Sequence, residues 1–204
     1  MSEVYLTMAY LAPIQYYSKL FRTEKAVIEK YDHYQKQTYR NRCVIAGANG
    51  PLTLSIPVVK PENPKTFTSN IRISEHGNWQ HLHWHAISSA YNSSPFFEYY
   101  ADDFAPFYHK KQTWLFDFNE ELRQLACRLL EIEPAVSFST FYSEAPIDAD
   151  FREAIHPKKD FKQTDPFFAA KEYYQVFKLK YGFLENLSII DLLFNMGPEA
   201  RLIL

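Results

Sequence analysis

The sequence predicts an α/β fold: a single compact domain over residues 1–204, with a mixed sheet, a long β-hairpin at about 34–58 and packed helices. Two observations favour this class. A β-rich run, a short helix after Pro13 and a second β-rich run follow one another at the start of the chain, which is typical of parallel strands joined by a helix. An Asn-Gly pair then lies between two further β-rich runs, which indicates an antiparallel hairpin.

The composition is that of a globular protein in water. Hydrophobic residues make up 47% and charged residues 23% of the 204 positions, which excludes disordered, collagen-like and membrane-spanning chains. The net charge of -2 provides no general attraction to nucleic acid or to an anionic membrane. The two cysteines, Cys43 and Cys127, form neither a disulfide framework nor a four-ligand zinc site. With no signal peptide evident at the N-terminus, we expect a cytoplasmic protein.

The first three elements are expected at residues 4–9, 14–21 and 26–29. The first and third segments are apolar and rich in strand-forming residues, whereas Pro13 is well suited to begin the helix between them. A strand, a helix and a strand in this order predict two parallel strands with a right-handed crossover.

The hairpin is expected to have arms at 42–46 and 52–58, joined by a type I′ turn at Asn49-Gly50. If the first arm extends back to residue 36, alternate side chains share one face. The face would then carry Lys36, Thr38, Arg40 and Arg42. Such a basic stripe predicts binding of phosphate or carboxylate groups. The alternative is that the arginines form ordinary ion pairs with acids such as Glu29 or Asp32.

A helix over 79–91, preceded by Asn78 as a capping residue, contains three histidines. At about 100° per residue, His83 points into the apolar face, whereas His81 and His85 point away from it. The three side chains therefore cannot form one ligand set. We expect His83 to be buried, His81 and His85 to be exposed, and no metal site.

The next helix is expected at 117–133, with Asp117 and Glu120 at the spacing of a capping box. Apolar residues recur along it at helical spacing and Pro134 ends it, so Cys127 is expected to be a structural residue. Residues 136–142 are consistent with a strand and residues 156–168 with a loop.

A last helix is expected at 187–196, capped by Asn186 and ended by Gly197. It is apolar except for a narrow strip formed by Ser188, Asp191 and Asn195. This strip faces solvent in the simplest interpretation. In the alternative it faces a cleft or polar partners, where burial would raise the pKa of Asp191 toward a range useful in catalysis.

Four stretches together resemble the WbqC-like family of bacterial proteins over nearly the whole chain. They are YDHYQKQTYRNRCVIAGANGPLTLSIPVV, WQHLHWHAISSAYNSSPFFEYY, KEYYQVF and GFLENLSIIDLLFNMGP. The residues that match the family's motifs are Gln35, Lys36, Arg40, Asn41, Arg42, His83, Tyr91, Pro95, Gln175, Asn186, Ser188, Asp191, Asn195 and Gly197. Members are found in part among surface-polysaccharide gene clusters. The resemblance therefore implies chemistry on an activated sugar or its precursor.

Two functions follow as hypotheses. The first is an enzyme, with a transferase as the leading type, that acts on a nucleotide-linked or phosphorylated sugar in surface-polysaccharide biosynthesis. Its catalytic acid and base would be His83 and Asp191, and its substrate-binding residues Lys36, Arg40, Asn41, Arg42, Gln175, Ser188 and Asn195. The second is a non-catalytic binding or assembly protein with an aromatic-rich core. The partner expected in the first case is a small anionic or sugar ligand; the cofactor, substrate and oligomeric state are left open.

Overall fold

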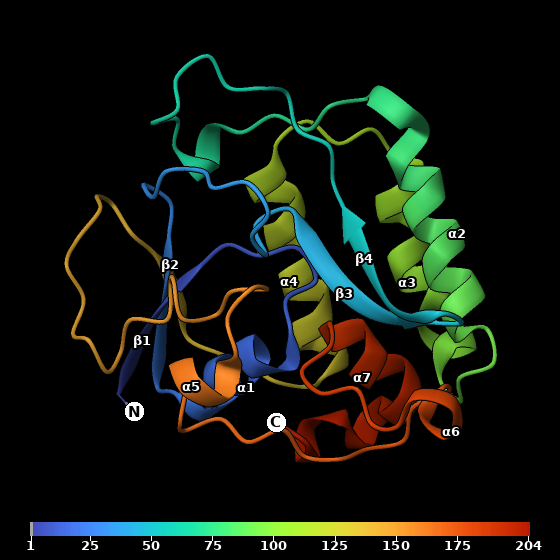
Figure 1. Ribbon diagram of the computed structural model, residues 1–204. Helices are drawn as coiled ribbons and strands as arrows, with labels where there is room; N and C mark the ends of the chain where they lie inside the picture. Colours follow the sequence, from blue (N-terminus) through green and yellow to red (C-terminus); the bar gives the residue numbers. More distant parts are fainter. Residues whose placement is uncertain (1) are drawn as a thin grey trace.

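The computed structural model describes residues 2–204 and contains a parallel sheet, a separate hairpin and helices packed around both (Figure 1). The strands are β1 (Glu3–Thr7), β2 (Lys25–Glu29), β3 (Arg42–Gly47), β4 (Gly50–Ser55) and β5 (Val136–Phe138). The helices are α1 (Ile14–Arg22), α2 (Trp79–Tyr91), α3 (Phe97–His109), α4 (Leu115–Leu129), α5 (Phe161–Thr164), α6 (Lys178–Tyr181) and α7 (Ile189–Met196). Parallel and antiparallel strands are both present, so the predicted α/β class is confirmed.

The parallel sheet has the strand order β1-β2-β5. The strand–helix–strand unit predicted at the start of the chain is confirmed, with Glu3 opposite Lys25 and Thr7 opposite Glu29. A further extended segment runs along the other side of β1, where the backbone of Tyr5 bonds to Ala149 and Phe151 at 2.9 Å each. The carboxyl ends of β1, β2 and β5 therefore lie at one edge of the sheet, and the chain returns to that edge after residue 149.

The β3–β4 hairpin is shorter than predicted, and its turn is of another kind. Gly47 pairs with Gly50, so the two loop residues are Ala48 and Asn49. Gly50 has a φ of 102°, whereas Asn49 is not among the residues of positive φ. A type I′ turn needs two such residues at its centre, and the turn prediction was therefore wrong.

The predicted basic stripe does not exist, because residues 34–41 form turns and not a strand. Gln37 has a φ of 62°, which an extended strand does not allow. The Thr38 hydroxyl donates to the backbone oxygen of Gln35 at 2.9 Å. Arg40 is drawn inward to Asp32, with 2.9 Å between Nε and Oδ2. The alternative of an ion pair with Asp32 is thus confirmed for Arg40.

Helix α2 has the predicted bounds, and the histidine prediction is confirmed: His83 is buried while His81 and His85 are exposed. The prediction that the Asn78 side chain caps the helix was wrong. Asn78 precedes the helix with a φ of 47°, and its side chain makes no capping hydrogen bond.

Helix α4 begins two residues earlier than predicted, with Trp114 at its N-cap, so Asp117 lies within the first turn and not at the cap. It ends before 133, because Glu131 adopts a φ of 54°. Its apolar stripe is buried as predicted up to Leu125, whereas Leu129 at its end is half-buried. Helix α3 was not predicted, since aromatic residues and Pro106 obscure its pattern, and α5 lies inside the expected loop at 156–168.

Helix α7 begins at Ile189, with Ser188 and not Asn186 at its N-cap. Asn186 instead accepts a hydrogen bond from the backbone nitrogen of Gln15, at 2.9 Å. Gly197 ends the helix with a φ of 54°, as predicted. The strip of Ser188, Asp191 and Asn195 is buried, so the interpretation that it faces solvent was wrong.

The core is aromatic, and one main cluster of buried apolar residues runs from Val4 to Leu204. Tyr10, Tyr17 and Tyr91 are among its fully buried side chains, so these tyrosines act as large core residues with a polar tip. Among the helices of residues 2–204, none has the length and apolar character needed to cross a membrane.

Candidate functional site

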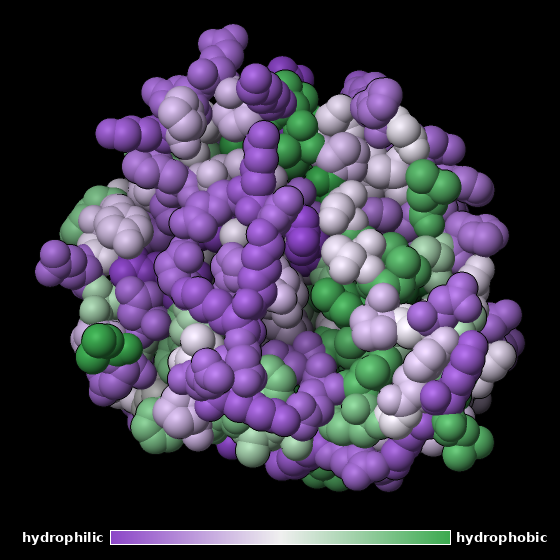
Figure 2. All heavy atoms as spheres, viewed as in Figure 1, coloured by the Kyte–Doolittle hydropathy of each residue, from purple (hydrophilic) through white to green (hydrophobic). Residues whose placement is uncertain are grey.

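A cavity of about 320 Å³ opens at the edge of the parallel sheet where β1 and β2 end. Ligands of open α/β sheets bind outside the carboxyl ends of parallel strands, because the loops that follow the strands meet there. In the view of Figure 2, hydrophilic residues cover most of the centre of the face, and hydrophobic residues gather to the right of it, over the β3–β4 hairpin and α7. The cavity is lined by Tyr31, Asp32, His33, Gln35, Arg40, Phe67, Tyr142, Asp150, Arg152 and Glu153.

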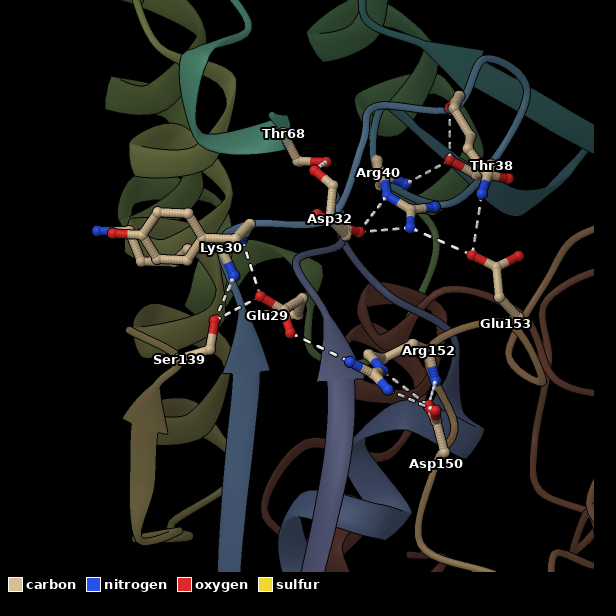
Figure 3. A network of polar contacts seen from close by, with 12 residues as sticks. Glu29, Lys30, Asp32, Thr38, Arg40, Thr68, Ser139, Asp150, Arg152 and Glu153 are labelled. Carbon is tan, nitrogen blue, oxygen red and sulfur yellow. Dashed lines mark hydrogen bonds and ion pairs between the residues drawn. The ribbon is translucent and has the colours of Figure 1, made fainter. Parts of the chain in front are cut away.

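The first polar group of the cavity is an ion pair between Arg40 and Asp32, both almost completely buried. Nε and Nη2 of Arg40 donate to Oδ2 of Asp32 at 2.9 and 2.5 Å. Nη2 also reaches Glu153 at 3.4 Å, and Glu153 accepts from Gln35 at 3.1 Å. Figure 3 shows Arg40 between the two carboxylates. A planar guanidinium held in this way orders the loop that follows β2.

The second polar group is centred on Arg152, which is 5% exposed. Its Nε and Nη2 bond to the two carboxylate oxygens of Asp150 at 2.9 and 2.6 Å. Its Nη1 bonds to Glu29, the last residue of β2, at 3.1 Å (Figure 3). Ser139, directly after β5, donates to Glu29 at 2.5 Å. Arg152 therefore joins the ends of neighbouring strands under the cavity.

Aromatic rings form the remaining wall. Phe67 stacks on His33 with 5.6 Å between ring centroids and meets the edge of Tyr31 at 5.5 Å. The guanidinium of Arg152 lies 4.6 Å from the centre of the Tyr142 ring. Flat apolar faces beside polar groups form a surface on which a ring-shaped ligand with hydroxyl groups can stack.

The network carries more negative than positive charge. Four carboxylates (Glu29, Asp32, Asp150 and Glu153) contact the two guanidinium groups of Arg40 and Arg152. Oδ1 of Asp32 is buried and has no hydrogen-bond partner within residues 2–204. Burial raises the pKa of Asp32, and the charge of Arg40 opposes this shift. One carboxylate oxygen of Asp32 thus lacks a partner, the hydroxyl of Thr68 bonds to the backbone oxygen of the same residue at 3.3 Å, and the arginines are already neutralised.

Of the predicted substrate-binding residues, Arg40 alone lines this cavity. Asn41 is buried and donates to the backbone oxygen of Ile56 at 2.8 Å, which fixes the loop before β3. Lys36 is exposed and Arg42 half-buried. Neither Lys36 nor Arg42 lines the cavity, and the buried Nε of Arg42 has no hydrogen-bond partner within residues 2–204.

Three other predicted residues meet around Asp191, which is fully buried. Its carboxylate accepts hydrogen bonds from Tyr91 at 2.7 Å, Tyr173 at 2.6 Å and Gln175 at 3.2 Å. Asn195 donates to its backbone oxygen at 2.7 Å. Ser188, at the start of the same helix, donates to the backbone oxygen of Leu11 at 2.7 Å. These contacts connect α7 to α2, to the segment before α6 and to the loop after β1.

The carboxylate of Asp191 is held by neutral donors, with no cation among its hydrogen-bond partners in residues 2–204. Burial raises its pKa, and the bonds from Tyr173 and Tyr91 oppose that shift. Asp191 lines none of five cavities of about 250–550 Å³ in the described chain. Its surroundings are those of a buried polar junction that fixes the packing of helices.

His83 lies in a different part of the core. Nδ1 is 3.0 Å from the hydroxyl of Tyr10, which is 2.8 Å from that of Tyr108. Burial lowers the pKa of His83 to about 4, opposed by a hydrogen bond to the backbone of Ser55. The imidazole is therefore neutral at pH 7. No hydrogen bond in the described chain joins His83 to Asp191, so the predicted acid and base are not placed side by side.

A second cavity, of about 440 Å³, lies beside α1 and is lined in part by Lys19 and Arg22. Its cations are already paired: Lys19 contacts the buried Asp165 at 2.7 Å, and Gln15 donates to the other oxygen of that carboxylate at 2.8 Å. Arg22 bonds to the backbone oxygen of Leu204. The remaining charged residue of its lining is Asp148, an exposed carboxylate.

The side chains that could bind a metal ion do not cluster in the described chain. Within residues 2–204, no three His, Cys, Asp or Glu side chains are grouped so that they could hold a metal ion. Cys43 and Cys127 are both buried and free. Burial raises the pKa of both thiols, which makes them poor nucleophiles.

Sequence reasoning missed most of the cavity. Asp32 lies three residues after β2, a position at the carboxyl edge of a parallel sheet where ligand-binding residues are common. That signal was available, although Asp32 was named only as an ion-pair partner. Asp150, Arg152 and Glu153 carry no comparable signal, because nothing in the sequence shows that residues 149–151 return to the side of β1.

Comparison with known proteins identifies a family. The model of the WbqC-like protein family matches residues 9–155. The "Uncharacterized protein Rv1507c" of Mycobacterium tuberculosis (strain ATCC 25618 / H37Rv) is 26% identical over 211 residues, which cover 91% of this chain and 89% of that protein. No solved structure is detectably similar. The residues around the cavity at the strand ends, from Tyr31 to Glu153, all fall within the matched range.

We predict that Tyr173→Phe lowers the free energy of unfolding by about 1.5–3 kcal/mol at neutral pH, because it removes a hydrogen bond to a buried carboxylate. The matched control is Tyr174→Phe, since Tyr174 is 53% exposed. Denaturant titration of the two variants measures the difference. Equal stabilities would show that Asp191 does not depend on this donor.

We also predict that His83 contributes to acid sensitivity. Its pKa of about 4 lies below the ordinary value of about 6.5, so the fold favours the neutral form. The resulting stability is complete above about pH 6.5 and is lost as the pH falls toward 4, by roughly 3 kcal/mol at most. His83→Gln should flatten the pH dependence of unfolding in this window, whereas His81→Gln at the exposed position should not. A wild-type slope retained in the His83 variant would contradict the assignment.

Proposed function

The chain belongs to the WbqC-like protein family, and we propose that it is an enzyme that binds the sugar part of its substrate in the cavity at the carboxyl ends of β1 and β2. The observation that carries the proposal is the buried Arg40–Asp32 pair beside the ring of Phe67. A carboxylate with a spare acceptor atom suits the hydroxyl groups of a sugar, and an aromatic face suits its apolar side.

In this proposal Arg40 does not bind the phosphate group of the substrate, although the sequence had predicted that it would. Asp32 and Glu153 already neutralise its guanidinium, and a further anion would be placed next to these carboxylates. Exposed lysines near the cavity wall are better suited to a phosphate or nucleotide attached to the sugar. Lys36 directly follows Gln35 of the wall, and Lys158 contacts Gln37 in the same loop.

Asp32 is the candidate acid or base of the reaction. It lines the cavity, and burial raises its pKa, which is the combination expected of a carboxyl group that exchanges protons with a substrate. Asp191 and His83 take structural roles in this proposal, because their polar atoms are bonded within the core. A transferase that modifies a surface-polysaccharide precursor is the reaction class that we propose.

The alternative function, a non-catalytic assembly protein, is favoured by one observation. The segment after β5 exposes Phe141 by 67%, Tyr142 by 59% and Ile147 by 96%. Such side chains are typical of a surface that contacts another protein. Binding of a sugar at the cavity would favour the enzyme over this alternative.

We predict that a panel of monosaccharides and nucleotide-linked sugars contains a ligand that stabilises the protein against heat. At 100 times its dissociation constant, the ligand should add about 2.7 kcal/mol. Phe67→Ala should weaken the binding by removing the stacking face while leaving the buried ion pairs in place. The matched control is Phe21→Ala on α1, since Phe21 is 46% exposed and does not line the cavity. A ligand that binds both variants equally would show that the site lies elsewhere.

A further inference from the structure

The cavity at the strand ends has an excess of negative charge that a neutral sugar does not explain. Four carboxylates share two guanidinium groups, so the network carries two more negative than positive charges. Arg152 donates to Asp150, to Glu29 and to the backbone oxygen of Ser143. Each of the three nitrogens of Arg152 therefore already has a partner in Asp150, Glu29 or Ser143.

The unmatched negative charge lies on Asp32 and Glu153, the two carboxylates that contact Arg40. Asp32 is 6% exposed, and Oδ1 has no partner within residues 2–204. Glu153, whose side chain is 52% exposed, receives a 3.4 Å contact from Arg40 and one hydrogen bond from Gln35. A buried carboxylate oxygen without a partner is costly, and a donor that also carries positive charge would offset this cost better than a hydroxyl group does.

The aromatic rings of the cavity wall also favour a positively charged group. Tyr31 and Phe67 meet edge to face, and both line the cavity together with Asp32. The face of an aromatic ring attracts an ammonium group, and the attraction grows as the ammonium group is desolvated. The rings of the wall and the carboxylate oxygen without a partner thus both favour an ammonium group.

We propose that the cavity binds a sugar that carries a primary ammonium group, with the ammonium next to Asp32 and Glu153 and the ring against Phe67. This inference rests on the proposed function and adds the substrate class: an amino sugar with a free amine. Acylation of the amine would remove its charge and leave the carboxylates unmatched. The cavity would therefore discriminate between a free and an acylated amino sugar.

The test compares sugars that differ at one position. Glucosamine, glucose and N-acetylglucosamine present an ammonium, a hydroxyl and an acetamido group at the same carbon, and galactosamine with galactose repeats the comparison. Titration at about pH 6, followed by calorimetry or NMR, should give at least ~10-fold tighter binding for the amino sugars. The preference should disappear at about pH 9, where an amine of this kind is neutral.

Two variants and a control assign the preference to the carboxylates. Asp32→Asn should abolish it, and Glu153→Gln should reduce it without breaking the Arg40–Asp32 pair, which protects the test against misfolding of the first variant. Glu121→Gln changes charge equally at an exposed position on α4 and should keep the preference. Ethanolamine should bind far more weakly than glucosamine, because it lacks the ring.

The possible results separate the two proposals. Equal affinity for glucose and glucosamine, with loss of both in Phe67→Ala, would overturn the ammonium proposal and leave the sugar site standing. Binding of ethanolamine as tight as that of glucosamine would overturn the assignment to a sugar. The absence of binding by every sugar would contradict both proposals. A preference for amino sugars that persists unchanged in Asp32→Asn and Glu153→Gln would also overturn the ammonium proposal.

Discussion

The pairing of two buried arginines with the carboxylates at the ends of β1 and β2 holds this part of the molecule together. A buried charge is tolerated only when it is paired and hydrogen-bonded, and Arg40 and Arg152 each meet two carboxylates. The partners lie on segments far apart in the sequence, from Glu29 to Glu153. Removal of one partner would leave a buried charge, so the loops around the cavity depend on one another.

The polar core and the cavity have separate tasks in this account. Asp191 receives hydrogen bonds from Tyr91, Tyr173 and Gln175, and these donors come from different parts of the chain. The carboxylate of Asp191 is satisfied by these donors, and such a junction fixes how helices pack. The cavity instead retains an acceptor without a partner on Asp32. A polar group left unsatisfied beside a cavity is more informative about ligands than a buried group whose bonds are complete.

Local sequence signals predicted the parallel strand–helix–strand unit, helix α2 and the stop at Gly197, because periodicity and helix-ending residues act over a few positions. They failed at residues 36–40, where a long-range ion pair from Arg40 to Asp32 overrides the extended pattern. The burial of the Asp191 strip also depends on donors from distant segments. The segment from 149 to 153 carries no local signal, since its position beside β1 is set by tertiary pairing alone.

An NMR titration of the backbone amides with glucosamine tests whether this cavity binds the sugar, because it maps the contacted residues without assuming a reaction. We expect the largest changes in amide chemical shift at Tyr31 to His33, at Phe67 and at Asp150 to Glu153, the segments that line the cavity. Residues around His83 and Asp191 should change little. Shift changes centred on those two residues, or on the cavity beside α1, would contradict the account.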